Sequence, residues 1–129
     1  MRFLITGITG FAGPHLARLL LNEGHVVHGI VRTANGREQD LLDILQPDEI
    51  QEIKFHYLDL KHYYSVDRLF SKEEFEGVFH LAAQSHPPTS FDDPILTFSE
   101  NVNASVNLIT ALEAMDTKLM FCSTSEVYG

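Results

Sequence analysis

The sequence reads Ser-Thr-Ser-Glu-Val-Tyr-Gly over positions 123–129, so hydroxyl groups and a carboxylate follow directly after an apolar segment. The hydroxyl of Thr124 can polarise a carbonyl or hydroxyl group of a substrate, and a poised carboxylate such as that of Glu126 can act as a general base. These residue types therefore predict that Thr124 and Glu126 are catalytic. The alternative is a polar loop in which Glu126 lies in solvent.

A glycine-rich string, Gly-x-x-Gly-x-x-Gly, lies between an apolar strand pattern and a helical pattern. The first glycine of such a string allows a tight turn, the second lets the backbone approach a pyrophosphate, and the third lets helix and strand pack closely. The following helix N-terminus presents free N–H groups to phosphates. An ordinary tight turn is the alternative, and a Walker-type loop is excluded because no lysine follows the string. The predicted cofactor contacts here are Gly7, Thr9, Gly10, Phe11, Ala12 and Gly13.

The residue after the second apolar segment decides which dinucleotide is favoured. A site for NAD places an acidic residue there to hold the ribose 2′-hydroxyl. This sequence has Arg32 at that point. A guanidinium suits a 2′-phosphate both in charge and in bidentate geometry. We therefore predict that Arg32 binds the cofactor and that NADP is preferred over NAD. The alternative is an arginine in a solvated loop.

Two later segments also end in residues suited to a dinucleotide cleft. After the third segment, Asp59 can accept a hydrogen bond from an adenine amino group, with Leu60 beside it for a backbone contact; a turn cap is the alternative for Asp59. After the fourth segment, small side chains leave room for a flat ligand, although packing alone also explains them, and polar side chains can reach ligand hydroxyl groups. This segment contributes the predicted cofactor contacts Leu81, Ala82 and Ala83 and the predicted substrate contacts Gln84 and Ser85.

Other chemistry is not indicated by the sequence. The seven histidines show no ligand spacing such as His-x-x-x-His, so no metal site is predicted. Tyr57 and Lys61 have a Tyr-x-x-x-Lys spacing, but it starts in a strand and crosses a turn, so the two side chains do not share a helical face. Cys122 is predicted to be a small core residue.

Short apolar segments that alternate with helical patterns must position these residues. The predicted strands are 2–6, 25–31, 53–58, 77–83 and 118–123. Asp93 and Pro94 provide an N-cap and a first-turn proline for a long helix over 94–115. Its apolar residues recur every three to four positions, at Ile95, Phe98, Val102, Val106, Ile109 and Leu112.

Strands that are apolar throughout and alternate with helices predict an α/β fold, a doubly wound parallel sheet of the NAD(P)-binding Rossmann type. In such a sheet, ligands bind beyond the carboxyl ends of the strands, where the strand order reverses. The candidate cofactor, substrate and catalytic residues named above lie at or after the carboxyl end of a predicted strand. The fold therefore gathers them at one edge of the sheet.

Composition narrows the class of protein further. Nine Lys and Arg stand against 18 Asp and Glu among 129 residues, a net charge of −9, whereas nucleic acids and anionic membranes attract basic surfaces. No apolar run approaches the roughly 18 residues of a membrane span. The single cysteine excludes a disulfide framework. No nucleic-acid or membrane partner is expected. The absence of a signal segment before Phe3 predicts a cytoplasmic protein.

The motifs together resemble those of the extended short-chain dehydrogenase/reductase superfamily, specifically its nucleotide-sugar epimerases and dehydratases. The resemblance covers the whole chain and is greatest to the GDP-mannose 4,6-dehydratases. It rests on the strings GITGFAG, VHGIVR, LAAQSH, SFDDP and STSEVYG. Three departures stand out: Ser125 replaces the Asp usual in thymidine-nucleotide glucose dehydratases, Ala104-Ser105 replaces Gly-Thr, and Phe98 stands where related dehydratases often have Tyr.

The resemblance implies a reaction on a nucleotide sugar, GDP-mannose. NADP removes a hydride from C4 of the sugar, a base takes the C5 proton, water leaves from C6, and the hydride returns to C6. The product is a 4-keto-6-deoxy sugar nucleotide. Thr124 would hydrogen-bond the reacting oxygen at C4, and Glu126 would be the base at C5 and the acid at C6.

The resemblance also places the base of the hydride step on a Tyr-x-x-x-Lys helix that follows the last motif. We therefore expect residues 1–129 to be an NADP-binding Rossmann domain, truncated before that helix and the C-terminal substrate domain, and inactive alone. The full-length parent is expected to be a homodimer or homotetramer. The alternatives are another nucleotide-sugar epimerase, a reductase or UDP-glucuronate decarboxylase, and a non-catalytic NADP-binding module.

Overall fold

A computed structural model describes residues 1–32 and 37–128, and for 37–39, 125 and 126 it describes the backbone alone. Its centre is a five-stranded sheet in the order β3-β2-β1-β4-β5, with every neighbouring pair parallel. The strands are β1 (Arg2–Thr6), β2 (Val26–Val31), β3 (Lys54–Tyr57), β4 (Gly77–His80) and β5 (Lys118–Phe121). The strand order reverses beside β1, as expected for a doubly wound sheet.

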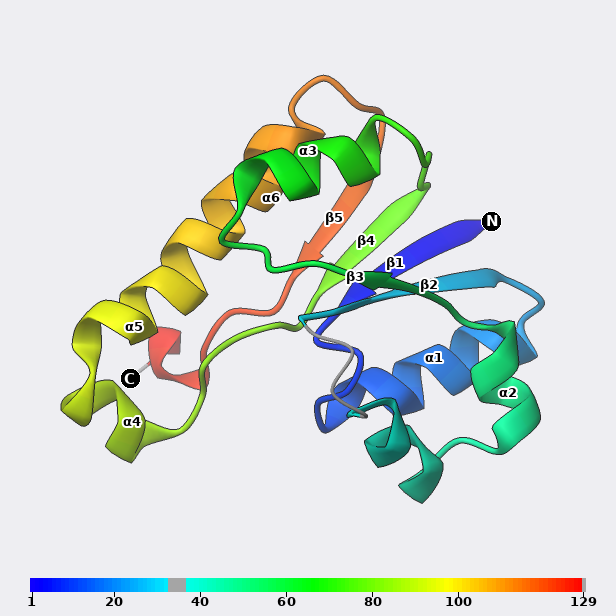
Figure 1. The fold of residues 1–129 in the computed structure, drawn as a ribbon, viewed down its shortest axis with the longest axis horizontal. Helices are drawn as coiled ribbons and strands as arrows, with labels where there is room; N and C mark the ends of the chain where they lie inside the picture. The colour runs from blue at the N-terminus through cyan, green and yellow to red at the C-terminus, as the bar shows by residue number, and fades with distance from the viewer. Residues whose placement is uncertain (33–36, 129) are drawn as a thin grey trace.

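Helices cover both faces of the sheet. Figure 1 shows α1 and α2 on one face and α3 and α6 on the other. The helical segments are α1 (Ala12–Asn22), η1 (Arg37–Asp43), α2 (Pro47–Glu52), α3 (Tyr63–Phe70), α4 (Pro87–Asp92), α5 (Pro94–Phe98), η2 (Ser99–Asn103), α6 (Ala104–Leu112) and η3 (Ser125–Tyr128). The predicted fold class is therefore confirmed.

Two apolar cores lie between the sheet and its helices, one on each face. Leu4 and Ile5 are adjacent on β1 and both fully buried, yet they belong to different cores because successive strand residues point to opposite faces. Ala17 and Leu20 of α1 pack against the Ile5 side, and Leu108 of α6 packs against the Leu4 side. Two-sided burial explains why the inner strands β1, β2 and β4 are apolar without alternation.

Two of the predicted strands extend too far at their carboxyl ends. The fourth strand ends at His80 rather than at residue 83, and the fifth ends at Phe121 rather than at 123. The prediction that Cys122 is a core residue was wrong, because its side chain is exposed. The backbone N–H of Cys122 still donates to the carbonyl of His80, but Cys122 lies beyond the end of β5 and lines a cleft.

The long predicted helix starts as expected but is not one regular helix. The Asp93 side chain accepts a hydrogen bond of 2.8 Å from the Leu96 N–H, which confirms the N-cap. The helix then runs through α5, a π-helical segment η2 and α6, and it ends at Leu112 rather than at residue 115. A π-helical turn often marks a functional position, because it rotates side chains out of the regular helical register.

The apolar positions that the sequence predicts for this helix lie mainly on its solvent-exposed face. Of the six predicted apolar positions only Leu112 is buried, and the exposed ones are Ile95, Phe98, Val102, Val106 and Ile109. The face packed on the sheet is formed by Ala104, Ser105, Leu108, Ala111 and Leu112. Two apolar stripes thus run along one helix, and only one of them contacts the core.

No helix within the described part of the chain combines the length and apolar character needed to cross a membrane.

Candidate functional site

A cleft of about 1400 Å³ opens at the carboxyl ends of β1 to β4. Ser85, a predicted substrate contact, lines this cleft. Every predicted cofactor contact lines it as well, namely Gly7, Thr9, Gly10, Phe11, Ala12, Gly13, Arg32, Asp59, Leu60, Leu81, Ala82 and Ala83. These residues come from four separate strand ends, and the parallel sheet brings them together. The Phe11 side chain is 90% exposed at this cleft, an uncommon placement for a large apolar ring.

The three glycines of the first loop differ in how strongly their surroundings require glycine. Gly7 has φ +72°, and a Cβ atom there would lie 2.8 Å from the backbone nitrogen of Ala82. A Cβ atom at Gly13 would lie 2.6 Å from the carbonyl oxygen of Gly7, which prevents any larger residue from packing there. Gly10 is exposed, and a Cβ atom there would meet only the Gly7 carbonyl oxygen, at 3.1 Å. The fold therefore requires Gly7 and Gly13, whereas Gly10 leaves open space over the loop.

A buried chain of hydrogen bonds fixes the floor of the cleft. The Ala82 N–H donates to Thr6 Oγ1 (3.2 Å), Thr6 Oγ1 lies 2.7 Å from His80 Nδ1, and His80 Nε2 lies 2.9 Å from Ser105 Oγ. The Ser105 hydroxyl donates to the Asn101 carbonyl at 2.6 Å. A hydroxyl has one proton to donate.

Ser105 must therefore accept from His80 Nε2–H, and the Thr6 hydroxyl must donate to His80 Nδ1. These directions assign the neutral Nε2–H tautomer to His80. Burial lowers the pKa of this imidazole, which keeps the ring neutral. The relay joins the ends of β1 and β4 to η2 and α6.

Asn101 ties the loop after β4 to the π-helical segment. Its side chain accepts from the Gln84 N–H at 2.6 Å and donates to the Gln84 carbonyl at 3.0 Å. The Gln84 side-chain amide is bonded to the backbone of His86, at 2.7 and 3.0 Å. The structure therefore turns the Gln84 amide onto its own loop, whereas Ser85 is exposed in the cleft.

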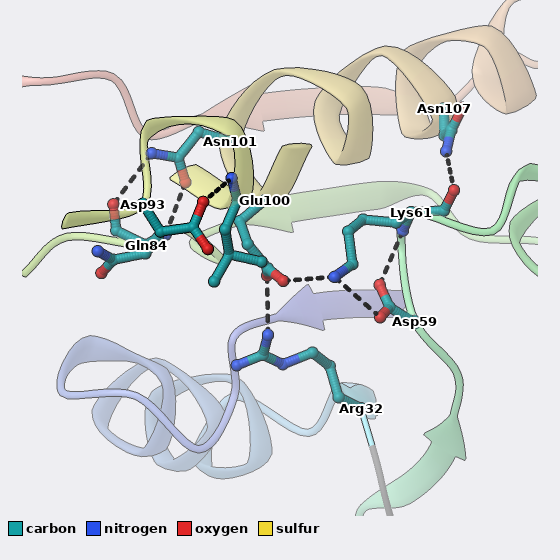
Figure 2. A network of polar contacts seen from close by, with 9 residues as sticks. Arg32, Asp59, Lys61, Gln84, Asp93, Glu100, Asn101 and Asn107 are labelled. Carbon is teal, nitrogen blue, oxygen red and sulfur yellow. Dashed lines mark hydrogen bonds and ion pairs between the residues drawn. The ribbon is translucent and has the colours of Figure 1, made fainter. Parts of the chain in front are cut away.

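The predicted cofactor residue Arg32 belongs to a charged network. Figure 2 shows Glu100 of η2 between two cations: Glu100 lies 2.8 Å from Arg32 and 2.6 Å from Lys61. Lys61 also lies 3.6 Å from Asp59, whose other oxygen accepts from the Lys61 N–H at 2.9 Å. Hydrogen bonding to Glu100 raises the pKa of Lys61. Asp59 thus caps its turn and also lines the cleft, and its contact with an adenine amino group stays a prediction.

The two predicted catalytic residues lie after β5. Thr124 is exposed, and its carbonyl accepts from the Val127 N–H at the start of η3. The backbone of Glu126 lies in η3, but its side chain is outside the described residues. The catalytic roles of Thr124 and Glu126 stay predictions.

Metal-ligand spacing in the sequence does not reveal a pair of histidines on the sheet. His28 of β2 and His56 of β3 are hydrogen-bonded through Nδ1 and Nε2 at 2.8 Å, and Glu73 lies beside them. Within the described residues this is the one group with possible metal ligands close together. Each imidazole already partners the other, and Glu73 is ion-paired with Lys54, so the groups are satisfied without an ion. The pairing of β2 with β3, not sequence spacing, brings the two histidines together.

Comparison with known proteins decides the family. A family model described as "GDP-mannose 4,6 dehydratase" matches residues 4–129, nearly the whole chain. The chain belongs to this family. The resemblance seen in the sequence motifs is thereby confirmed.

Curated relatives carry the same name. The chain is 36% identical over 133 residues to "GDP-mannose 4,6-dehydratase" of Vibrio cholerae serotype O1, covering 98% of this chain and 36% of the relative. It is 35% identical over 137 residues to "GDP-mannose 4,6 dehydratase" of Homo sapiens, covering 98% and 36%. The chain therefore spans about a third of the length of these relatives.

Solved structures of related enzymes share the fold. UDP-glucose 4-epimerase of Thermus thermophilus, in complex with NAD, matches with a TM-score of 0.81 and 32% identity, over 96% of this chain and 38% of that one. UDP-Glc/GlcNAc 4-epimerase of Campylobacter jejuni matches with a TM-score of 0.85 and 27% identity, over 99% and 38%. A dinucleotide-binding fold is thus common to the family and its structural neighbours.

Proposed function

We propose that this chain is the cofactor-binding part of an NADP-dependent nucleotide-sugar 4,6-dehydratase that acts on GDP-mannose. The supporting observation is the cleft that unites the glycine loop with Arg32, Asp59 and the small residues after β4. The relatives' names indicate the substrate.

The residues present fit a dinucleotide. The open space over Gly10 suits a pyrophosphate, which the first N–H groups of α1 would face. The small side chains of Ala82 and Ala83 leave room for the nicotinamide half, and Arg32 is the cation for a 2′-phosphate. The cofactor, when bound, supplies hydride transfer.

The chain's own residues would perform the proton steps. In this proposal the Thr124 hydroxyl holds the reacting oxygen at C4 by a hydrogen bond. Glu126 takes the C5 proton, which a neighbouring C4 ketone acidifies, and returns it to the hydroxyl group leaving from C6. The sequence contains one Tyr-x-x-x-Lys, which begins at the end of β3 at Tyr57. Because that pair is not on a helix, the base of the hydride step is not assigned to it.

Cofactor titration tests the proposal. Calorimetry should show that the chain binds NADP more tightly than NAD, and Arg32→Asp should reverse that order, because an acid repels the 2′-phosphate and accepts from a 2′-hydroxyl. A preference for NADP that Arg32→Asp leaves unchanged would refute the role of Arg32. Incubation with GDP-mannose and NADP should give no 4-keto product, and product formation would show that the site is complete.

The structural neighbours favour one alternative. Both solved structures described above are of nucleotide-sugar epimerases, and one of them is described with NAD. An epimerase of this type would prefer NAD, so the same titration separates the two functions. Tighter binding of NAD by the unmodified chain would support the epimerase.

A further inference from the structure

The arginine assigned to the 2′-phosphate already has an anionic partner. Arg32 lies 2.8 Å from Glu100, although the Arg32 side chain is 58% exposed and extends from the end of β2. Glu100 comes from η2, 68 residues later in the chain. The ion pair therefore links the strand end to the helix on the other side of the cleft.

Glu100 is an unusual residue for a cleft that accepts a polyanion. Its side chain is only 15% exposed, and it lines the same cleft as the glycine loop. A largely buried carboxylate repels a nearby phosphate, and the repulsion is stronger than at a free surface because water screens it less. Arg32 and Lys61 offset this charge, one on each carboxylate oxygen.

The Lys61 side of the network is held firmly in place. Asn107 of α6 donates to the carbonyl oxygens of Leu60 and Lys61, both at 2.9 Å. Asp59 accepts from the Lys61 N–H in the same turn. Figure 2 shows Asn107 and Asp59 both joined to Lys61, with Arg32 on the other side of Glu100. Arg32, by contrast, has a mostly exposed side chain and is the member of the network best able to change partners.

We propose that Glu100 is a specificity-determining residue whose carboxylate competes with the 2′-phosphate of the cofactor for Arg32. The inference rests on the proposed function, because it assumes a dinucleotide in this cleft. A ligand with a 2′-phosphate must draw Arg32 away from Glu100 and bring a second anion near it. A ligand with a free 2′-hydroxyl needs neither change. Glu100 thus makes the preference for adenosine with a 2′-phosphate over adenosine with a 2′-hydroxyl smaller than Arg32 alone would make it.

The test uses probes that occupy only the adenosine half of the cleft. Binding of 2′,5′-ADP and of 5′-AMP to the chain is measured by calorimetry for wild type, Glu100→Gln and the control Glu52→Gln. Glu52 is an exposed acid of α2, so its variant removes one charge away from the cleft. Removing one ion-pair competitor should raise the 2′,5′-ADP affinity about threefold to tenfold and the 5′-AMP affinity less than about twofold. Glu52→Gln should change neither.

A double variant identifies the route of the effect. In an Arg32→Leu background, Glu100→Gln should favour 2′,5′-ADP much less than it does when Arg32 is present, because the competed cation is gone and only the direct repulsion by Glu100 is relieved. Circular dichroism is used to check that each variant is folded. Glu100→Asp, which keeps the negative charge, is a second variant and should keep the wild-type preference between the two ligands.

Three results would overturn the inference. Equal gains for both probes would indicate general repulsion, and a weaker 2′,5′-ADP affinity in Glu100→Gln would show that Glu100 positions Arg32 for the phosphate. Unchanged affinities for both probes would show that no competition exists. Failure of the proposed function is distinguishable. If the cleft holds no dinucleotide, wild type and every variant bind neither probe. If it holds NAD rather than NADP, wild type and Glu100→Gln both bind 5′-AMP more tightly than 2′,5′-ADP.

Discussion

At the scale of single residues, the directions of the hydrogen bonds around His80 decide its tautomer. The chain from Ala82 through Thr6, His80 and Ser105 has one donor for each acceptor, so only one tautomer of His80 satisfies it. No described buried side-chain nitrogen or oxygen lacks a partner. The relay holds the loop after β4, which forms the floor of the cleft.

His80→Leu should therefore destabilise the fold and weaken cofactor binding. It leaves the buried hydroxyls of Thr6 and Ser105 without the imidazole partner, a loss of about 1–3 kcal/mol in the free energy of unfolding. Urea denaturation measures the loss, and His62→Leu, at an exposed histidine, is the control. Equal stability of the two variants would contradict a structural role for the relay.

His28 should make stability depend on pH. Burial, followed by the neighbouring His56, lowers the pKa of His28 to about 4 in the folded chain, against 6.5 ordinarily. Between these values the unfolded chain binds a proton that the folded chain does not. The free energy of unfolding should thus fall as the pH drops from about 6.5 to 4, by at most roughly 3 kcal/mol from this residue.

Urea midpoints at pH 7 and pH 5 test this expectation. Burial also lowers the pKa of His56 and His80, so the wild-type decrease contains all three contributions. The matched variant His28→Gln keeps a polar side chain without the titration and should show a smaller decrease. An identical pH dependence in both proteins would argue against His28 as a source.

At the scale of elements, the glycine loop shows how backbone packing selects residues. Gly13 lies against the carbonyl of Gly7 at a distance no Cβ atom tolerates, whereas Gly10 meets only one atom at 3.1 Å. The absence of a Cβ atom at Gly13 lets the start of helix α1 lie this close to the loop after β1. The same loop would receive the pyrophosphate.

Gly13→Ala should thus lower the free energy of unfolding by about 1–3 kcal/mol, since the backbone itself must move. Gly10→Ala should cost less than about 1 kcal/mol and instead weaken NADP binding, because its methyl group enters the space over the loop. Thermal unfolding and calorimetric titration of the pair measure both effects. A stable Gly13→Ala would contradict the packing argument.

The sequence predicted elements better than it predicted side-chain faces. The succession of strands and helices, the Asp93 cap and the glycine loop follow from local residue types. The outward face of the long helix was not separable from its inward face, because Val106 and Leu108 are both strongly apolar. The Glu100 network and the His28–His56 pair also depend on sheet register and helix placement, which bring together residues 28 or more positions apart.

At the scale of the whole molecule, the chain spans about a third of its relatives and has an apolar stripe in solvent. Phe98, Val106 and Ile109 lie on this stripe, and each side chain is about half exposed. We expect the stripe to support self-association, because burying apolar area on both copies is favourable.

Sedimentation velocity over a range of concentrations measures this association. Ile109→Glu should shift the chain toward monomer, whereas Leu19→Glu, at a similarly exposed apolar position of α1, should not. A monomer at every concentration for the wild type would refute the expectation.

The central position of β1 in the sheet affects how fast its backbone amides exchange with solvent. β1 is hydrogen-bonded on both sides, and Leu4, Ile5 and Thr6 are fully buried. Its amides should therefore be the last to exchange with deuterium, opening only when the whole domain unfolds. The glycine loop begins directly after this strand. The slowest-opening part of the molecule thus carries the loop that would meet the phosphates, while the edge strands β3 and β5 open earlier.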